Sequence, residues 1–117
     1  MPLIGTDIEQ ISRFEQAMAR TPRLAERLFT VAERAYCEGK ARAAQHYAAR
    51  FCAKEAFAKA LGVPLSWQEV EVVRDGDGSP AIRARGEAAV ALAGRTVRVS
   101  LSHAGDYAIA VVLVEDR

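Results

Sequence analysis

The sequence lacks any run of about 18 apolar residues, the length that a helix needs to cross a bilayer. Its first residues, Met1–Asp7, reach an acidic side chain before an apolar stretch as long as that of a signal peptide has formed. We therefore expect no membrane span, no export signal and a cytoplasmic protein.

Cysteine, glycine and proline are also scarce. Cys37 and Cys52 are too few for a disulfide scaffold or a zinc site, and we expect both to be reduced thiols. The 8 glycines and 4 prolines are too few for a fibrous or disordered chain. The 117 residues, 50% of them hydrophobic, are typical of a single globular domain over residues 1–117.

The net charge is only +1, from 16 basic and 15 acidic side chains. This balance excludes a generic nucleic-acid-coating protein, because such binding depends on many neutralised phosphates. The charge is nevertheless unevenly spread. Residues 1–12 hold two acids and no base (−2), residues 13–59 ten bases and five acids (+5), and residues 60–117 six bases and eight acids (−2). The basic side chains are thus concentrated in the middle segment.

Apolar spacing and capping residues predict helices in that middle segment. Ile11, Phe14 and Met18 recur at the spacing of a helical stripe, and Thr30 precedes Glu33 at the spacing of a capping box. The longest predicted helix is rich in alanine and free of glycine and proline. The predicted helices are Ile11–Arg20, Arg23–Phe29, one from Thr30 to near Gly39, and Arg42–Leu61.

Most of the remaining chain favours strands, with alternating or continuous apolar residues between turn residues. The predicted strands are Leu3–Ile8, Trp67–Arg74, Pro80–Ala84, Val97–Ser102 and Tyr107–Val114, with turns at Asp75–Gly78 and His103–Asp106 and a short helix at Gly86–Ala93. We expect the apolar run Tyr107–Val114 to be a central strand. This order predicts an α+β fold in which a largely antiparallel sheet packs against one long and several short helices.

Three acidic residues stand where they could hold a cation. Asp7 and Glu9 are two residues apart at the end of the first strand, so a strand would project both to the same side. Glu55 falls within the apolar stripe of the long helix, flanked by Lys54, where a charge is costly unless it is paired or bound to a metal. Carboxylates in this number suit Mg²⁺. The alternatives are an acidic helix cap for Asp7 and a surface ion pair of Glu55 with Lys59.

The segment Ser100–His103 does not predict a Ser/His nucleophile. Adjacent strand residues point to opposite faces, and the chain has no nucleophile-elbow motif. His103 is either a residue that begins a turn or one that contacts a phosphate or carries a proton. Asp77–Pro80 is a turn first and a ligand-contacting loop second.

Taken together, four segments resemble the holo-acyl-carrier-protein synthases over nearly the whole chain. These segments are Ile4–Glu9 with Arg13, then Arg50–Ala56, Lys59–Gly62 and Ser100–His103. The string Arg-Phe-x-Ala-Lys-Glu-Ala, with Gly-x-Asp-Ile upstream, is highly specific to that family. The connection Gly62–Trp67 is shorter than is usual there, and Ser79 stands where lysine is frequent.

The resemblance implies transfer of 4′-phosphopantetheine from coenzyme A to a serine of an apo acyl carrier protein, with release of adenosine 3′,5′-bisphosphate. Asp7 and Glu55 would hold Mg²⁺, and Glu9 would be a candidate third ligand, since larger transferases use an Asp-x-Glu pair. A metal-bound water or a nearby carboxylate would accept the serine proton. The resemblance further implies catalytic roles for Glu55, Lys54 and His103, and coenzyme A contacts from Arg50, Lys54, Lys59, Gly78, Pro80, Ser102 and His103.

The resemblance also implies partners. Acyl carrier proteins are acidic, and Arg13 and Arg20 on one helix, with Arg23 and Arg27 on the next, could bind a carboxylate-rich helix. Family members of this size are trimers with each site at a subunit boundary, so we expect a homotrimer that binds neither nucleic acid nor membrane.

Two other interpretations remain open at the level of the sequence. A non-catalytic module that binds coenzyme A or a carrier protein would keep the fold and the arginines, but it would have no reason to keep both carboxylates and Lys54. A nucleic-acid-binding protein would use the same arginines. The single tryptophan and the scattered aromatic residues, however, provide no stacking platform for bases.

Overall fold

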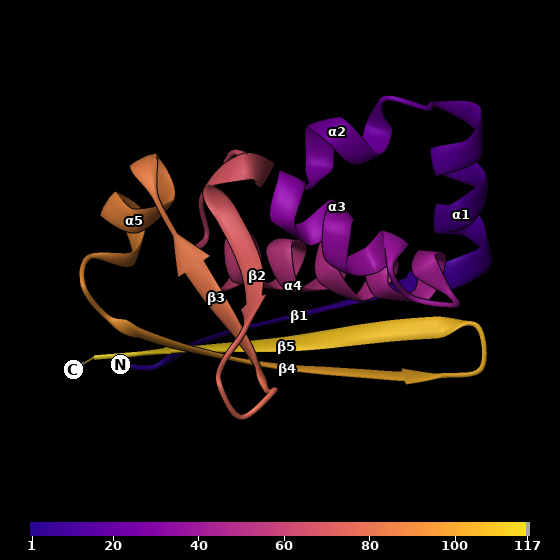
Figure 1. Ribbon diagram of the computed structural model, residues 1–117. Coiled ribbons are helices and arrows are strands. Elements are labelled where there is room, and N and C mark those ends of the chain that lie inside the picture. The colour runs from indigo at the N-terminus through magenta and orange to yellow at the C-terminus, as the bar shows by residue number, and fades with distance from the viewer. Residues whose placement is uncertain (117) are drawn as a thin grey trace.

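The computed structural model describes residues 1–116, which form two antiparallel sheets and the helices that cover them. The α+β class predicted from the sequence is confirmed (Figure 1). The elements are β1 (Leu3–Gln10), α1 (Ile11–Arg20), α2 (Leu24–Leu28), α3 (Val31–Glu38), α4 (Ala43–Leu61), the 3-10 turn η1 (Trp67–Glu69), β2 (Val70–Arg74), β3 (Pro80–Ala84), α5 (Gly86–Leu92), β4 (Thr96–Ala104) and β5 (Tyr107–Glu115). No helix in this part of the chain is long and apolar enough to cross a membrane.

The larger sheet has the strand order β1–β5–β4, so β5 is the central strand, as predicted. The register aligns Asp7 with Ala110 on one side and Leu101 with Ala110 on the other. β2 and β3 pair only with each other, which divides the strands into two sheets rather than the one expected. In Figure 1 this β2–β3 hairpin crosses the larger sheet on the side of β4.

Three boundaries differ from the prediction by two residues or more. β1 continues to Gln10, and β4 continues through His103 and Ala104, which were expected to be in a turn. The reason for the second difference is pairing with β5, which leaves only Gly105 and Asp106 to close the hairpin. At the start of the smaller sheet, Trp67–Glu69 form η1 instead of strand, because the Trp67 carbonyl accepts from the Val70 N–H within the turn. The same carbonyl accepts a hydrogen bond from Lys54 Nζ at 2.8 Å.

Helix α4 lies along the larger sheet and packs on it through small residues (Figure 1). Ala53 and Ala56 on the helix, and Ala108 and Ala110 on β5, are all fully buried. Phe51, on another side of α4, packs against Phe14 of α1 and is only partly buried. Alanine carries a weak hydrophobic signal, yet it permits the closest approach of helix to sheet, and this is the face that the fold buries.

Gly5 marks the tightest point of this contact. A Cβ at Gly5 would fall well inside the van der Waals radius of the Ala56 carbonyl oxygen and 2.7 Å from the amide nitrogen of Ala60. Both atoms belong to helical backbone, so neither can move without displacing α4. Position 5 therefore tolerates only glycine.

We predict that Gly5→Ala lowers the free energy of unfolding by about 3 kcal/mol, because overpacking against backbone cannot be relieved by a rotamer change. Gly76→Ala is the matched control, since a Cβ there meets nothing within 4 Å, and we expect it to change stability by less than about 0.5 kcal/mol. Urea denaturation at one fixed protein concentration measures both. Equal stability of the two variants would contradict the packing argument.

Candidate active site

The first half of the candidate site is a group of carboxylates between β1 and α4. Alternation along β1 turns Asp7 and Glu9 toward the helix, while Thr6 and Ile8 face away. Asp7 Oδ1 lies 3.0 Å from Lys59 Nζ, and its side chain is 9% exposed. Lys59 thus pairs with Asp7 across the two elements, not with Glu55 on its own helix as the alternative interpretation supposed.

Crowding of negative charge perturbs this group. Burial, a hydrogen bond with Asp7 and repulsion by the charges of Asp7 and Glu55 raise the pKa of Glu9 to about 7. Burial and the charge of Asp7 also raise the pKa of Glu55. The carboxylates of Asp7, Glu9 and Glu55 all interact with the ammonium of Lys59. A further cation would stabilise their ionised forms.

The residues present fit a hard cation held by two carboxylates. Asp7 Oδ2 is buried and accepts no hydrogen bond from any described residue, so it is free to act as a ligand. Across residues 1–116, no three His, Cys, Asp or Glu side chains are already grouped closely enough to hold a metal ion together, so Glu9 as third ligand stays a prediction. Mg²⁺ commonly takes only one or two carboxylates and completes its shell with water and phosphate oxygens. Asp7 and Glu55 are therefore a sufficient pair.

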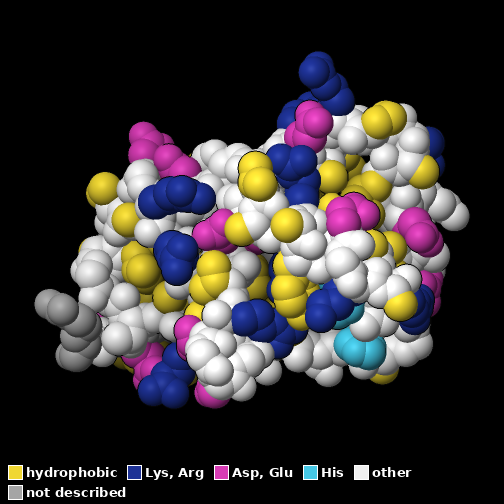
Figure 2. All heavy atoms as spheres, in the orientation of Figure 1, with side chains coloured by type: hydrophobic (Ala, Val, Ile, Leu, Met, Phe, Trp, Pro, Cys, Tyr) yellow, Lys and Arg dark blue, Asp and Glu magenta, His cyan; other side chains and the backbone are white. Residues whose placement is uncertain are grey.

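The second half of the candidate site is a pocket on the other side of α4, where the helix meets β3 and β4. It contains four of the predicted coenzyme A residues: Arg50, Pro80, Ser102 and His103. Figure 2 shows Lys and Arg side chains beside the histidines on this face. The full lining is Gln45, His46, Ala49, Arg50, Arg74, Pro80, Leu101, Ser102 and His103.

Cations gather around the ring of Tyr36 next to this pocket. The Arg50 guanidinium lies 4.0 Å from the ring centroid, Lys40 Nζ 4.7 Å and the Arg74 guanidinium 5.4 Å. Although burial favours the neutral phenol, the three positive charges together lower the pKa of Tyr36. Burial, and then the same charges, lower the pKa of His46.

This positive charge is not neutralised within the described chain. No carboxylate of residues 1–116 lies within 4.0 Å of the cationic groups of Arg50, Arg74 or Lys40. Arg50 is 1% exposed, and its Nε has no hydrogen-bond partner there. A buried guanidinium without a counter-ion is costly, so the pocket is suited to an anion such as phosphate.

The remaining predicted residue of this half, Gly78, lies in the turn between β2 and β3. Its carbonyl accepts a hydrogen bond from Arg74 Nη1 at 2.6 Å, which ties the turn to the pocket. His103 Nε2 lies 3.2 Å from Gln45 Nε2 at the opposite wall. Tyr36, His46 and Arg74 could not be predicted as pocket residues from the sequence, because contacts between α3, α4 and β2 leave no spacing signal in a single chain.

The two halves are separated within one chain. His103 and Glu9 lie in one row of the sheet, each paired with Ala108 of β5, so two strand spacings, about 10 Å, divide them. Helix α4 lies over the strand between them. Arg50 and Glu55, five residues apart on that helix, project about 140° apart. The predicted site residues therefore form two half-sites rather than one.

Lys54 belongs to neither half. Its side chain is 0% exposed, and its ammonium lies 2.7 Å from Glu33 Oε1 and donates to the carbonyls of Trp67 and Val70 at 2.8 and 2.7 Å. All three N–H donors are thus engaged inside the protein. The predicted contact of Lys54 with phosphate is not formed, because the helix turns this side chain away from the larger sheet and toward Glu33 and the carbonyl of Val70. The sequence had marked Glu33 only as a helix cap.

The predicted partner-binding arginines are all exposed. Arg13 and Arg20 lie seven residues apart on one side of α1. Arg20, Arg23 and Arg27 line a groove where α1 meets α2. Arg13 lies outside this groove, so the basic surface extends along α1 beyond it.

Known proteins are similar to this chain in sequence and in fold. The sequence model of the 4′-phosphopantetheinyl transferase superfamily matches residues 3–112. A holo-[acyl-carrier-protein] synthase from Geobacter metallireducens is 50% identical over 95% of this chain and 94% of its own length. One from Salinispora arenicola is 48% identical over 96% of each chain.

Solved structures of several proteins are similar to this chain in fold. A complex of an ACPS with CoA from Chronobacterium ammoniagenes superposes with a TM-score of 0.88 at 31% identity, over 100% of this chain and 98% of that chain. The holo-[acyl-carrier-protein] synthase of Helicobacter pylori in complex with coenzyme A gives a TM-score of 0.86 at 30% identity, over 97% and 100%. The chain therefore belongs to the 4′-phosphopantetheinyl transferase superfamily, which confirms the resemblance seen in its motifs.

Proposed function

We propose that this protein transfers 4′-phosphopantetheine from coenzyme A to a serine hydroxyl of an apo acyl carrier protein, with Mg²⁺, and releases adenosine 3′,5′-bisphosphate. The observation that carries the proposal is the pair of half-sites, one of carboxylates for a hard cation and one of cations for phosphate. The relatives named holo-[acyl-carrier-protein] synthase, and their complexes with coenzyme A, support it.

The two half-sites contact different parts of coenzyme A. Arg50 and Arg74 bind the phosphate-rich nucleotide end in the pocket, which Pro80, Ser102 and His103 shape. Gly78 holds Arg74 in place through its carbonyl. Lys59, 53% exposed beside Asp7, contacts the pyrophosphate in the role first expected of Lys54.

The reaction takes place at the carboxylates. Asp7 and Glu55 would hold Mg²⁺, which would neutralise charge on the phosphates as the pyrophosphate bond breaks. The serine oxygen bonds to the phosphorus nearer to the pantetheine, and the bond to the leaving bisphosphate breaks. A carboxylate of the cluster accepts the serine proton, and Glu9, two residues from Asp7 and on the same face of β1, is placed for this step.

A complete site needs two copies of the chain, because α4 separates the half-sites. The face of the larger sheet that points away from α4 exposes apolar side chains, Ile4 at 70% and Ile8 at 58% among them, with Ile109 and Val111 beside them. Such a face marks a protein interface. We propose a homotrimer in which the carboxylates of one subunit meet the cationic pocket of the next.

The protein works in the cytoplasm as a single domain. Both thiols, Cys37 and Cys52, are unpaired and buried, and burial raises the pKa of Cys37 to about 11. Such thiols are typical of a reducing compartment. The exposed arginines Arg13, Arg20, Arg23 and Arg27 bind the acidic carrier protein.

We predict that Glu55→Gln lowers the rate of transfer at least about 100-fold, because an amide is a much poorer ligand for Mg²⁺ than a carboxylate. The measurement is the intact mass of an apo carrier protein after incubation with coenzyme A and Mg²⁺. Glu87→Gln on α5, far from both half-sites, is the control and should retain full activity. Undiminished transfer by Glu55→Gln would refute the metal-ligand role. No mass gain with the wild type, across carriers from fatty-acid and polyketide systems, would refute the proposed function.

A mixing experiment tests the shared site. Glu55→Gln removes one half-site and Arg74→Glu the other, so each variant alone should be inactive. Random co-assembly of equal amounts should restore about a quarter of the wild-type activity, since one interface in four joins two intact half-sites. If the mixture stays inactive, although mass spectrometry shows mixed oligomers, both half-sites act within one chain.

Charge reversal tests the docking surface. We predict that Arg13→Glu combined with Arg20→Glu raises the KM for the carrier protein at least about tenfold, because these arginines meet its carboxylates. The KM for coenzyme A should change less than about twofold, since neither residue lines the pocket. Steady-state kinetics with each substrate varied in turn separates the two. Equal effects on both KM values would rule out this assignment.

A further inference from the structure

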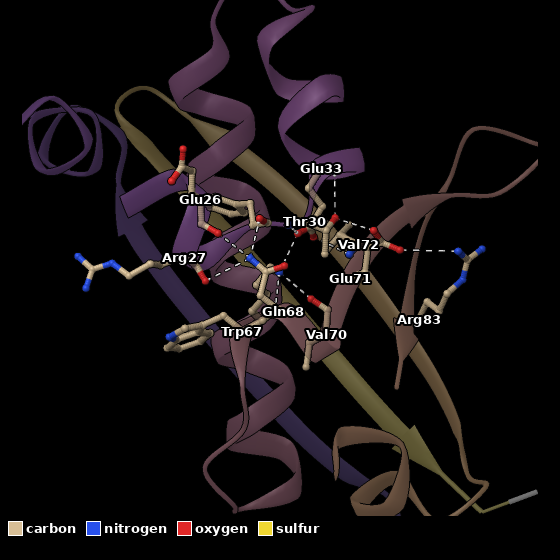
Figure 3. A network of polar contacts seen from close by, with 12 residues as sticks. Glu26, Arg27, Thr30, Glu33, Trp67, Gln68, Val70, Glu71, Val72 and Arg83 are labelled. Carbon is tan, nitrogen blue, oxygen red and sulfur yellow. Dashed lines mark hydrogen bonds and ion pairs between the residues drawn. The ribbon is translucent and has the colours of Figure 1, made fainter. Parts of the chain in front are cut away.

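Gln68, in the turn η1, lies against the end of the short helix α2 (Figure 3). Its side-chain Nε2 donates to the carbonyl oxygens of Glu26 at 2.8 Å, Arg27 at 3.3 Å and Phe29 at 2.7 Å. One amide group thus serves three carbonyl acceptors within four residues at the point where α2 ends. Neither the family motifs nor the two half-sites include this residue.

Helix α2 needs such an anchor. It has five residues, Leu24–Leu28, and no side chain caps its N-terminus. A helix this short has few internal hydrogen bonds, and its last four carbonyls find no partner within it. The carbonyls of Glu26 and Arg27 are among these, so Gln68 supplies the donors that the helix itself cannot.

Gln68 is itself held to helix α4. The carbonyls of its neighbours Trp67 and Val70 accept hydrogen bonds from Lys54 Nζ, and Lys54 forms the buried ion pair with Glu33. Lys54 directly precedes Glu55 in the chain. A continuous path of polar contacts therefore joins the end of α2 to the helix turn that carries the predicted metal ligand.

The far end of this path is also fixed. Glu33 accepts hydrogen bonds from the backbone N–H groups of Thr30 and Val72, and the Thr30 hydroxyl donates to Glu71 (Figure 3). These bonds hold the start of α3 against β2. Since α2 and α3 are separated only by Phe29 and Thr30, the path fixes the end of α2 and the start of α3 together.

We propose that Gln68 is a positioning residue for carrier-protein docking. It holds α2, and with it Arg23 and Arg27, at a set place relative to Glu55 on α4. The proposal rests on the proposed function, in which these arginines bind the carrier. Gln68 touches neither the carboxylates nor the lining of the cationic pocket, so its effect is confined to one substrate.

The test replaces Gln68 with residues of nearly equal size. Gln68→Met removes the donor group, and Gln68→Glu turns a carboxylate toward three carbonyls. Gln68→Lys restores donors where the end of a helix favours a cation. Because the last two also change the charge near the docking surface, Ser66→Glu and Ser66→Lys in the same turn are the matched controls, since the Ser66 side chain makes no capping bond.

We expect Gln68→Met to raise the KM for the carrier protein about fivefold, with less than about twofold change in kcat and in the KM for coenzyme A. Gln68→Glu should raise the KM for the carrier protein further than Ser66→Glu does. The KM of Gln68→Lys for the carrier protein should stay within about twofold of that of Ser66→Lys. Without carrier protein, hydrogen exchange of the α2 amides should be faster in Gln68→Met, while exchange in α4 and β5 should be unchanged.

Several results would overturn the proposal. An unchanged KM for the carrier, equal rises in both KM values, or a fall in kcat alone would each show that Gln68 does not act through docking. Unaltered exchange in α2 would show that it is no anchor. A wild type that modifies no carrier protein would overturn the proposed function and this proposal with it, whereas an active wild type with an unaffected Gln68→Met variant would overturn this proposal alone.

Discussion

The close contact between helix α4 and the larger sheet is the constraint on which the rest of the structure depends. Gly5 and a row of alanines bring the helix so near to β1 and β5 that backbone meets backbone. At this distance Asp7 on the strand and Glu55 on the helix interact, and Lys59 reaches across from helix to strand. A larger residue at the contact would separate the groups that make up the carboxylate half-site.

The same contact separates the carboxylate half-site from the cationic half-site. Because α4 covers the central strand, carboxylates gather at the β1 edge and cations at the β4 edge, each group short of partners of the opposite sign. Each half-site is electrostatically incomplete, and in the proposed function a coenzyme A with bound Mg²⁺ would supply what both lack. In the proposed trimer, the exposed apolar face of the sheet would let a second copy bring the two kinds of half-site together.

A third side of α4 carries Lys54, whose polar contacts all lie inside the protein. Lys54 is buried with Glu33 at a distance that satisfies both charges, and its remaining donors fix the turn that follows the helix. A buried ion pair adds little net stability compared with apolar packing, but removing one partner alone is costly. This arrangement suits a role in holding α2, η1 and β2 in a set geometry, and it separates Lys54 from Arg50 and Glu55 of the same motif, which belong to the two half-sites.

Local signals in the sequence determined much of this protein. Alternation marked β4 and β5, the capping box of Thr30 and Glu33 marked α3, and the alanine-rich run marked α4, since each depends on residues close in the chain. The motifs likewise identified the family and the carboxylates Asp7 and Glu55. Only the tertiary structure decided that Lys54 points inward, that Arg74 and Tyr36 join Arg50, and that His103 lies across the sheet from Glu9. These facts depend on the rotation of α4 and on strand order, which are set by packing between distant segments and leave no trace in local spacing.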